Sequence, residues 1–314
     1  MAAPQWNQED FGQPQENIIK HLVSDHQYAK DQGIEIVPLL IEEAHKNKTK
    51  VLLSFAGAGF NEIVSSIEKQ KKFIDMMIRF IDKYNYDGIE IDWEQDLSLP
   101  LHAEFISNIR LKLDDLEKKR NDSKHLYLTT ALHSWQVYHK ELANKLASNV
   151  DWINIMTYDM GGGIWGNVPE HNTPLNKMEK ELKNWKVFNR NKLCIGLANY
   201  GFIYKDLSPG IKIEGKLDKN GKYFSYNNML PLLQKGWVEQ YDKKAKVSYY
   251  FSPDKSEFIT MENPKTILTK IQWITKEKYR GAFWWEFNYD IIYPTTQTGK
   301  IRHHLIDVVS KYLD

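Results

Sequence analysis

Short apolar stretches of strand character alternate with amphipathic stretches of helical character along most of this chain. Strand-like runs occur at 50–55, 88–93, 126–132, 152–158, 193–201 and 281–287. Helices are expected at 66–84, 100–119, 140–148, 175–188, 264–278 and 299–313. In the first of them, apolar residues recur at three- and four-residue spacing. Near-continuous apolar strands that alternate with helices predict a parallel sheet covered on both faces.

A closed barrel and an open, doubly wound sheet share this alternation. The two differ in where polar residues gather, because barrel enzymes collect catalytic groups at the carboxyl ends of several strands. Polar and aromatic residues stand at such ends in four of the predicted strands, namely Asp92 and Glu94, Tyr158 and Asp159, Tyr200, and Trp285 and Glu286. This distribution favours an α/β fold of the (β/α)₈, or TIM, barrel type.

A (β/α)₈ barrel closes with eight strands, whereas this chain supplies six predicted strands. Residues 1–35 contain no convincing strand pair and are expected to form an irregular segment. The barrel is expected over 36–314, apparently without its first two strands, and with a short insertion lobe at 202–263. Such a barrel would have open edges on the strands at 50–55 and 281–287.

Composition excludes several classes of protein. A chain of 314 residues with 42% hydrophobic and 26% charged residues can bury a sizeable core. A net charge of +1 without a long basic run disfavours nucleic acid as a partner, and no apolar run is long enough to span a bilayer. No export signal is recognisable at the N-terminus as given. An extracellular location would be expected if that terminus is incomplete, and a monomer is expected.

Residues 87–94 read DGIEIDWE and raise the question of function. Ile89, Ile91 and Trp93 predict a core strand. Successive side chains of a strand point to opposite sides, so the other face of this strand is entirely acidic. A metal site or a solvated acidic edge is disfavoured, because the apolar residues pin the strand in a core and no histidine is spaced to complete a metal set.

The acidic face consists of Glu90, Asp92 and Glu94. Like charges at close range raise at least one pKa, so such a cluster keeps a shared proton near neutral pH. A general acid must hold a proton of this kind. Glu94 is last on the strand and is the natural donor to a leaving group, while Asp92 can pass a proton or a hydrogen bond to it.

Residues 87–94 resemble the DGxDxDWE signature of glycoside hydrolase family 18, the chitinases and their relatives. Three further motifs follow in that family's order. Residues 54–57 (SFAG) resemble its SxGG motif, residues 156–159 (MTYD) match its M-x-Y-D motif, and residues 281–285 (GAFWW) resemble its G-x-M-x-W motif. The resemblance extends over about residues 36–313.

The resemblance implies retaining hydrolysis of β-1,4-linked N-acetylglucosamine, in which the substrate's own acetamido group supplies the nucleophile. Glu94 would protonate the glycosidic oxygen and later activate water. Asp92 would orient the acetamido group and stabilise it as it becomes an oxazolinium ion, with Glu90 behind it. Tyr158 would donate its hydroxyl to the acetamido carbonyl. No metal and no cofactor is implied.

The resemblance also implies a set of substrate-binding residues. Asp159 would hydrogen-bond the sugar, Met156 would line the pocket, and Trp285 would be the aromatic floor beneath a distorted sugar. The remaining members of the set are Asp87, Trp93, Tyr200 and Ser54. The expected partner is chitin or another glycan that contains N-acetylglucosamine.

Two residues depart from the family pattern, because Glu90 stands where the family has aspartate and Ala56 replaces the first glycine of SxGG. We expect Glu90 to compensate in part by reaching toward Ser54. Three other interpretations stay open: a chitinase-like lectin with weak or no activity, an endo-β-N-acetylglucosaminidase acting on N-glycan or peptidoglycan, and an inactive chain that lacks two strands. Retention of Glu94 argues for an enzyme.

Overall fold

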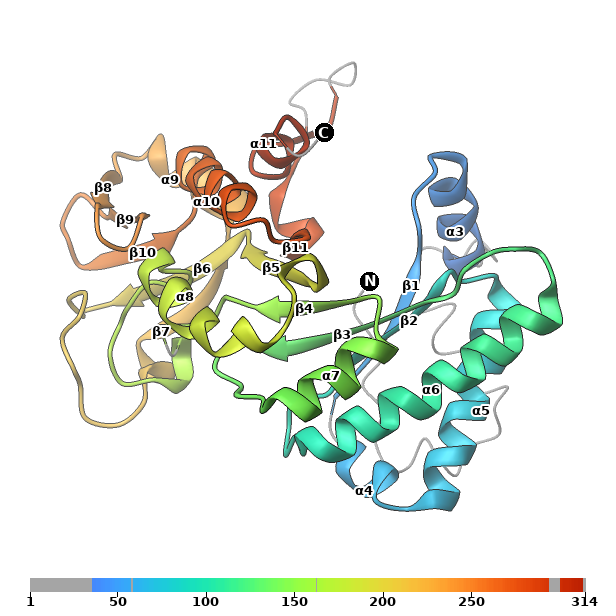
Figure 1. The fold of residues 1–314 in the computed structure, drawn as a ribbon. Coiled ribbons are helices and arrows are strands. Elements are labelled where there is room, and N and C mark those ends of the chain that lie inside the picture. The colour runs from blue at the N-terminus through green and yellow to red at the C-terminus, as the bar shows by residue number, and fades with distance from the viewer. Residues whose placement is uncertain (1–35, 58, 162, 294–299, 313–314) are drawn as a thin grey trace. The chain divides into compact units, whose positions relative to one another are not determined.

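The computed structural model describes residues 36–57, 59–161, 163–293 and 300–312 (Figure 1). The chain divides into two compact units. Of the described residues, unit 1 comprises those within 36–132 and 138–153, and unit 2 comprises those within 133–137 and 154–312. The segment 1–35, expected to be irregular, lies outside the described residues. The predicted division at residues 35, 202 and 263 stays a prediction.

Unit 1 contains parallel strands covered by helices (Figure 1). The strands β1 (Leu52–Ala56), β2 (Gly88–Asp92) and β3 (Tyr127–His133) pair in that order. The strand β4 (Trp152–Met156) begins in this unit, where the Asp151 amide donates to the Leu128 carbonyl. The helices are α3 (Ile36–Lys46), α4 (Phe60–Val64), α5 (Ile67–Tyr84), α6 (Leu99–Arg120) and α7 (Lys140–Asn149).

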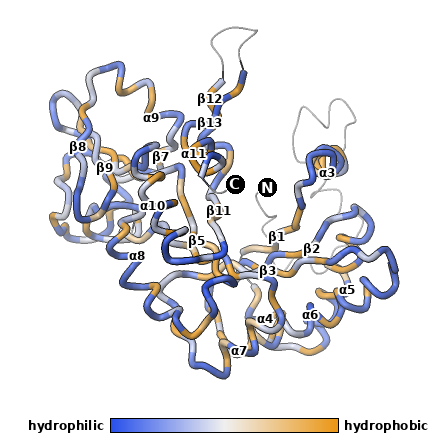
Figure 2. The backbone as a smooth tube through the Cα atoms, turned by 45° about the horizontal axis from the view of Figure 1, so that its top comes forward, coloured by the Kyte–Doolittle hydropathy of each residue, from blue (hydrophilic) through white to orange (hydrophobic). Residues whose placement is uncertain are grey.

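Helix α5 shows how local sequence sets these boundaries. The Ser66 hydroxyl caps its first turn by accepting from the Lys69 amide, and Asn85 ends the helix in the left-handed conformation. Its apolar residues recur on one face and are buried, while the opposite face is charged. Figure 2 shows this alternation of hydrophobic and hydrophilic positions along α5 and α6.

Unit 2 contains the end of β4 and two further parallel strands, β5 (Leu193–Ala198) and β11 (Gly281–Trp285), which pair so that Trp285 lies beside Ala198. Its helical segments are η2 (Gly163–Trp165), α8 (Leu175–Glu181), η3 (Leu182–Val187), η4 (Arg190–Lys192), α10 (Pro264–Lys276), η6 (Phe287–Asp290) and α11 (Ile306–Ser310). Two short strands, β12 (Ile291–Ile292) and β13 (Arg302–His303), pair with each other.

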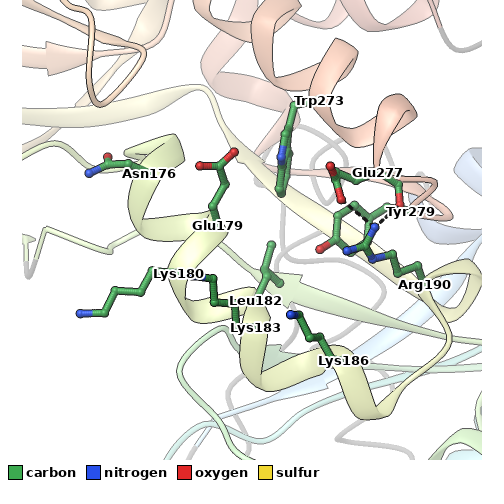
Figure 3. Close-up of a pocket in the computed structure, with 10 residues that line it drawn as sticks. All are labelled: Asn176, Glu179, Lys180, Leu182, Lys183, Lys186, Arg190, Trp273, Glu277 and Tyr279. Atoms are coloured by element: carbon green, nitrogen blue, oxygen red, sulfur yellow. Dashed lines mark hydrogen bonds and ion pairs between the residues drawn. The ribbon is translucent and has the colours of Figure 1, made fainter.

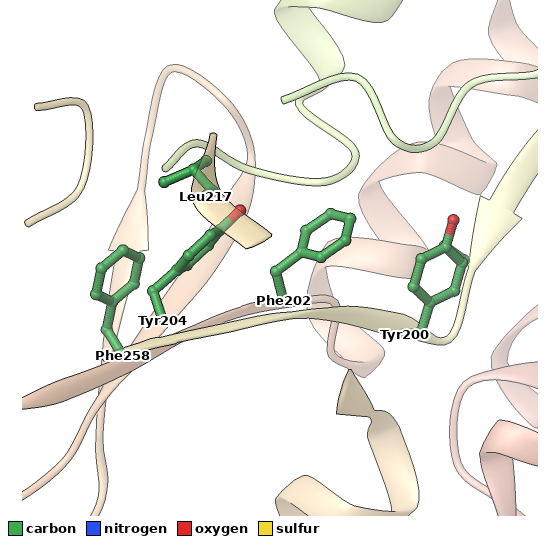
Figure 4. Packing of buried hydrophobic residues seen from close by; sticks show 6 residues of the cluster. Tyr200, Phe202, Tyr204, Leu217 and Phe258 are labelled. Atoms are coloured by element: carbon green, nitrogen blue, oxygen red, sulfur yellow. The ribbon is translucent and has the colours of Figure 1, made fainter. Parts of the chain in front are cut away.

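The segment between β5 and α10 forms an antiparallel sheet of order β7-β6-β10-β9-β8. Its members are β6 (Tyr200–Lys205), β7 (Gly221–Ser225), β8 (Val238–Asp242), β9 (Val247–Phe251) and β10 (Glu257–Met261), accompanied by η5 (Leu217–Lys219) and α9 (Tyr226–Leu233). Alternate residues of β6, namely Tyr200, Phe202 and Tyr204, form a buried cluster with Leu217 and Phe258 (Figure 4). The lobe therefore has a core of its own.

The predicted strands agree with the observed ones to within three residues, with one informative exception. The run 193–201 was expected to be a single strand, whereas β5 ends at Ala198 and Tyr200 begins β6 of the other sheet. Every residue of β5 is buried, as in a strand covered on both faces, whereas β6 carries aromatic residues at every second position. The change from a continuous to an alternating pattern marks the change of sheet.

Two helix predictions differ from the structure, and not every observed helix was predicted. The stretch 175–188 is the α-helix α8 followed by the 3₁₀ helix η3, where Leu182, Trp185 and Phe188 are buried at the three-residue spacing that a 3₁₀ helix brings to one face. Within 300–312 the only α-helix is α11, which is shorter than the helix predicted at 299–313. Helix α3 has no counterpart among the predicted helices. Among the described residues, no helix has the length and apolar character needed to cross a membrane.

Candidate functional site

A row of three polar side chains crosses the strands of unit 1. Ser54 on β1 and Thr129 on β3 lie in register with Glu90 on β2. The Ser54 hydroxyl donates to Glu90 Oε1 at 3.4 Å and the Thr129 hydroxyl donates to Oε2 at 3.0 Å. Each carboxylate oxygen of Glu90 therefore has its own donor, and such hydrogen bonds favour the charged form. The expected contact between Glu90 and Ser54 is present, at the long end of the hydrogen-bond range.

The next residue on the same face of β2 has a different environment. Asp92 lies in register with Ala56, whose methyl group offers no hydrogen bond. Its Oδ1 is buried and has no hydrogen-bond partner among the described residues. Burial raises the pKa of Asp92 to about 8, and the negative charges of Glu94 and Glu90 add to the effect. Asp92 is therefore protonated at neutral pH.

Glu94 stands two residues beyond Asp92, past the carboxyl end of β2, and is exposed to solvent. The sequence predicted that the acidic face keeps a shared proton, and the structure locates the raised pKa at Asp92. The acidic strand thus combines a carboxylate that accepts from two hydroxyls, a carboxyl group with a raised pKa and an accessible carboxyl group. Such a gradient along one strand face suits the storage and delivery of a proton.

Two residues of the expected substrate-binding set do not face this site. Trp93 is 1% exposed, stacks on Phe60 with ring centroids 5.6 Å apart, and donates its indole N–H to the Gln95 carbonyl. It lies on the apolar face of the strand and packs in the core. This position does not support its expected role in binding a substrate.

Asp87 precedes β2 and so lies at the opposite end of that strand from Glu94. Its carboxylate accepts hydrogen bonds from the His45 ring at 2.7 Å, the Lys50 ammonium at 3.0 Å and the Val51 amide at 2.8 Å. These contacts hold the pKa of Asp87 below its usual value, against the effect of burial. Asp87 anchors the chain that leads into β1, and this position does not support a role beside Glu94.

Unit 2 brings together a second group of expected site residues. The Tyr200 hydroxyl donates to Asp159 Oδ1 at 2.8 Å, and the Tyr158 and Tyr200 rings meet edge to face at 6.2 Å. Burial, with the negative charge of Asp159, holds the pKa of Tyr200 well above its usual value. Tyr200 is 3% exposed, and its hydroxyl orients the Asp159 carboxylate. Tyr158 is half-buried and is therefore more accessible to solvent.

Asn172 holds this arrangement together and was not predicted from the sequence. Its Oδ1 accepts from the Asp159 amide at 2.6 Å, and its Nδ2 donates to the Tyr200 carbonyl at 3.0 Å. Asp159 has a φ of 56°, in the left-handed region that non-glycine residues adopt at some cost. The Asn172 side chain therefore stabilises the turn that follows β4. Asn172 lies 13 residues from Asp159 in the chain, and the sequence pattern did not indicate this contact.

Met156 and Tyr158 occupy the end of β4, beside β5. Met156 is 6% exposed, and the Thr157 hydroxyl between them donates to the Gly196 carbonyl at 2.7 Å. A Cβ on Gly196 would lie 2.9 Å from the Tyr158 ring, so glycine is required for this close approach. Trp285 ends β11 with 43% of its surface exposed, as a residue that contacts a ligand requires.

A pocket of about 380 Å³ lies elsewhere in unit 2, between α8 with η3 and the end of α10 (Figure 3). Arg190 and Tyr279, which line it, precede β5 and β11, whereas Trp285 follows the other end of β11. The Arg190 guanidinium pairs with Glu277 and lies over the Tyr279 ring. The pocket is thus remote from the carboxyl ends of these strands. No group of three potential metal ligands occurs among the residues that the structure describes.

Comparisons with known proteins bear on this chemistry. The sequence model described as "Glycosyl hydrolases family 18" matches residues 16–290. The chain belongs to glycosyl hydrolase family 18. It is 27% identical over 281 residues to sporulation-specific chitinase 2 of Saccharomyces cerevisiae, covering 76% of this chain and 54% of that protein.

Solved structures of family 18 members support the barrel-type fold. A chitinase from Trichuris suis has a TM-score of 0.75 at 23% identity, over 88% of this chain and 84% of that one. A family 18 chitinase from Cycas revoluta in complex with (GlcNAc)₃ has a TM-score of 0.72 at 17% identity, over 84% and 83%. The predicted α/β barrel class is therefore confirmed. The chain spans 38–58% of the length of the first curated relatives it matches.

Proposed function

We propose that this family 18 member hydrolyses β-1,4-linked N-acetylglucosamine polymers such as chitin, with retention and with assistance from the substrate. The observation that carries the proposal is the gradient along β2, in which an exposed Glu94 follows a buried Asp92 whose pKa is raised to about 8. A leaving group needs an accessible acid, and that acid needs a neighbour that can hold or release a proton.

In this proposal Glu94 protonates the glycosidic oxygen and later takes a proton from the attacking water. Asp92 accepts a hydrogen bond from the N–H of the substrate's acetamido group, which orients the amide oxygen for attack on the anomeric carbon. The Ser54 and Thr129 hydroxyls each donate to one carboxylate oxygen of Glu90. The acidic face of β2 offsets the developing positive charge of the oxazolinium ion.

The residues gathered in unit 2 would bind the reacting sugar. Tyr158 donates its hydroxyl to the acetamido carbonyl, where charge develops. Asp159, whose carboxylate is oriented by Tyr200, accepts from a sugar hydroxyl, and Met156 lines the pocket. Trp285 provides an exposed indole on which the sugar ring stacks. Chitooligosaccharide is bound by the similar Cycas revoluta chitinase, which supports this class of substrate.

The test is hydrolysis of a fluorogenic chitooligosaccharide by the purified chain beside Glu94→Gln. We expect the substitution to lower kcat by about 10²–10⁴, because it removes the general acid. Glu141→Gln, an equally isosteric change at an exposed position of α7, is the matched control and should leave kcat unchanged. Equal rates for wild type and Glu94→Gln would refute the enzymatic assignment.

The same assay separates the remaining alternatives. A chitinase-like lectin would bind chitooligosaccharide without hydrolysis in either form. An endo-β-N-acetylglucosaminidase would cleave an N-glycan core or a peptidoglycan strand in preference to chitooligosaccharide. The oligomeric state and the cellular location stay predictions.

A further inference from the structure

The segment that follows β3 displays an exposed tryptophan that the proposed mechanism does not use. Burial alternates from Ser134 to Val137, so that Ser134 and Gln136 are buried at 2% and 9% exposure while Trp135 and Val137 are 57% and 64% exposed. Two large apolar side chains thus point to solvent from the turn that follows β3. An indole that is more than half exposed and held by its neighbours presents an open aromatic face to a ligand.

The Trp135 indole stacks on a neighbouring ring and its backbone is fixed. The His133 and Trp135 rings lie 5.1 Å apart with an interplanar angle of 15°. The Ser134 hydroxyl donates to the Glu181 carboxylate, and the Ser134 carbonyl accepts from the indole N–H of the buried Trp185 at 2.7 Å. The Gln136 amide closes a turn onto the His133 carbonyl at 3.1 Å. All these groups belong to unit 2, so the indole is preorganised.

The chemistry of this surface selects its ligand. The segment 133–138 reads HSWQVY and contains no Asp, Glu, Lys or Arg, so a charged polymer gains nothing from it electrostatically. A single indole with one valine is also much smaller than the roughly 800 Å² that each partner contributes to a stable protein interface. A flat aromatic face bordered by neutral polar groups suits the apolar face of a neutral pyranose ring.

We propose that Trp135, stacked on His133, is a sugar-binding platform that holds one N-acetylglucosamine ring of a β-1,4-linked chain. Equatorial substituents leave both faces of such a ring flat and rich in C–H groups, and so able to lie on the open face of the indole. This inference rests on the proposed substrate class of the same protein. Trp135 is a binding residue and takes no part in bond cleavage.

The test measures binding of chitohexaose and of insoluble chitin in the Glu94→Gln background, where no turnover consumes the ligand. Trp135→Ala is expected to weaken binding by about 5- to 20-fold, as loss of one stacking interaction should. Trp135→Phe should recover most of the affinity, whereas Trp135→Leu, which keeps an apolar side chain without a flat ring, should not. Ile211→Ala, at an apolar position of unit 2 with 61% exposure, is the control and should bind as the parent does.

Unchanged affinity in Trp135→Ala, or full affinity in Trp135→Leu, would overturn the platform. Each variant should unfold at the same temperature as the parent protein, because an exposed side chain adds little to stability. The proposal fails separately from the proposed function. Hydrolysis by wild type with unaltered binding by Trp135→Ala refutes only the platform, whereas absence of hydrolysis with weakened binding refutes only the enzymatic activity.

Discussion

Two buried carboxyl groups in this molecule have opposite surroundings. Asp92 in unit 1 is buried beside two other acids, and its Oδ1 has no hydrogen-bond partner among the described residues. Glu262 in unit 2 is 1% exposed, yet its carboxylate pairs with the Lys270 ammonium and accepts hydrogen bonds from the Thr173 and Thr266 hydroxyls. The two carboxyl groups therefore differ in the hydrogen-bond donors and the charges that surround them.

The comparison teaches which carboxyl group stabilises the fold and which one is available for chemistry. A buried acid with a cation and two hydroxyls has all its hydrogen bonds satisfied and holds neighbouring segments together. A buried acid without them keeps its proton and weakens the fold at neutral pH. Residues that are unfavourable for stability in this way occur typically at functional sites.

The largest expected effect on stability is at the Glu262 pair. Lys270→Met should lower the free energy of unfolding by about 3–5 kcal/mol, because it leaves the Glu262 carboxylate buried without its cation. Urea unfolding at pH 7 measures the change. Lys276→Met, an exposed lysine in the last turn of the same helix, is the matched control and should cost less than about 0.5 kcal/mol.

The double variant Lys270→Met/Glu262→Leu sharpens this test. Removal of both partners leaves no charge in the core, so most of the lost stability should return. If the double variant were as unstable as Lys270→Met, packing rather than the ion pair would explain the loss. The contrast with Asp92 would then lose its basis.

The second effect is the pH dependence that Asp92 confers. Its pKa is raised from 3.8 to about 8 in the folded protein, so the unfolded chain releases this proton at a lower pH than the folded chain. Stability is therefore highest below pH 4 for this group and falls as the pH rises toward 8. Relative to wild type, Asp92→Asn should gain up to about 1.4 kcal/mol of stability per pH unit across that window.

Urea unfolding of both proteins between pH 5 and pH 8 measures this difference. A constant difference across the window would show that Asp92 does not titrate there. In the activity assay, kcat/KM of wild type should decline above about pH 8, where Asp92 loses the proton that it can pass to Glu94. Asp92→Asn should be less active at every pH and should lack this alkaline decline.

The smallest expected effect concerns the hydroxyls that donate to Glu90. Thr129→Val removes the 3.0 Å donor to Glu90 Oε2 at nearly constant volume, and should cost about 1–2 kcal/mol of stability. Glu90 is one of the two acids whose charge raises the pKa of Asp92, so the alkaline limb of kcat/KM should also move. If the alkaline decline of kcat/KM occurred at the same pH as in wild type, the Thr129 hydroxyl would have no influence on the titration of Asp92.

Much of the fold could be predicted because its cause is local. Apolar runs marked the parallel strands, and the strand motifs of Asp92, Tyr158 and Trp285 indicated the family. The predictions failed where a residue's neighbours come from distant segments. Trp93 was assigned to the substrate, although its strand face packs against Phe60. Tyr200 was placed in the parallel strand, although it begins a strand of the antiparallel sheet.

The sequence by itself determined the order of the strands, the acidic face of β2 and the membership in family 18, because each depends on residues adjacent in the chain or on a motif in a fixed order. Only the tertiary structure decided that Asp92 holds the proton, that Asn172 supports Asp159, and that Trp135 is held exposed. Protonation depends on burial and on hydrogen-bond donors within a few ångströms. Thr129, 39 residues from Glu90 in the chain, reaches that distance only when β3 pairs with β2.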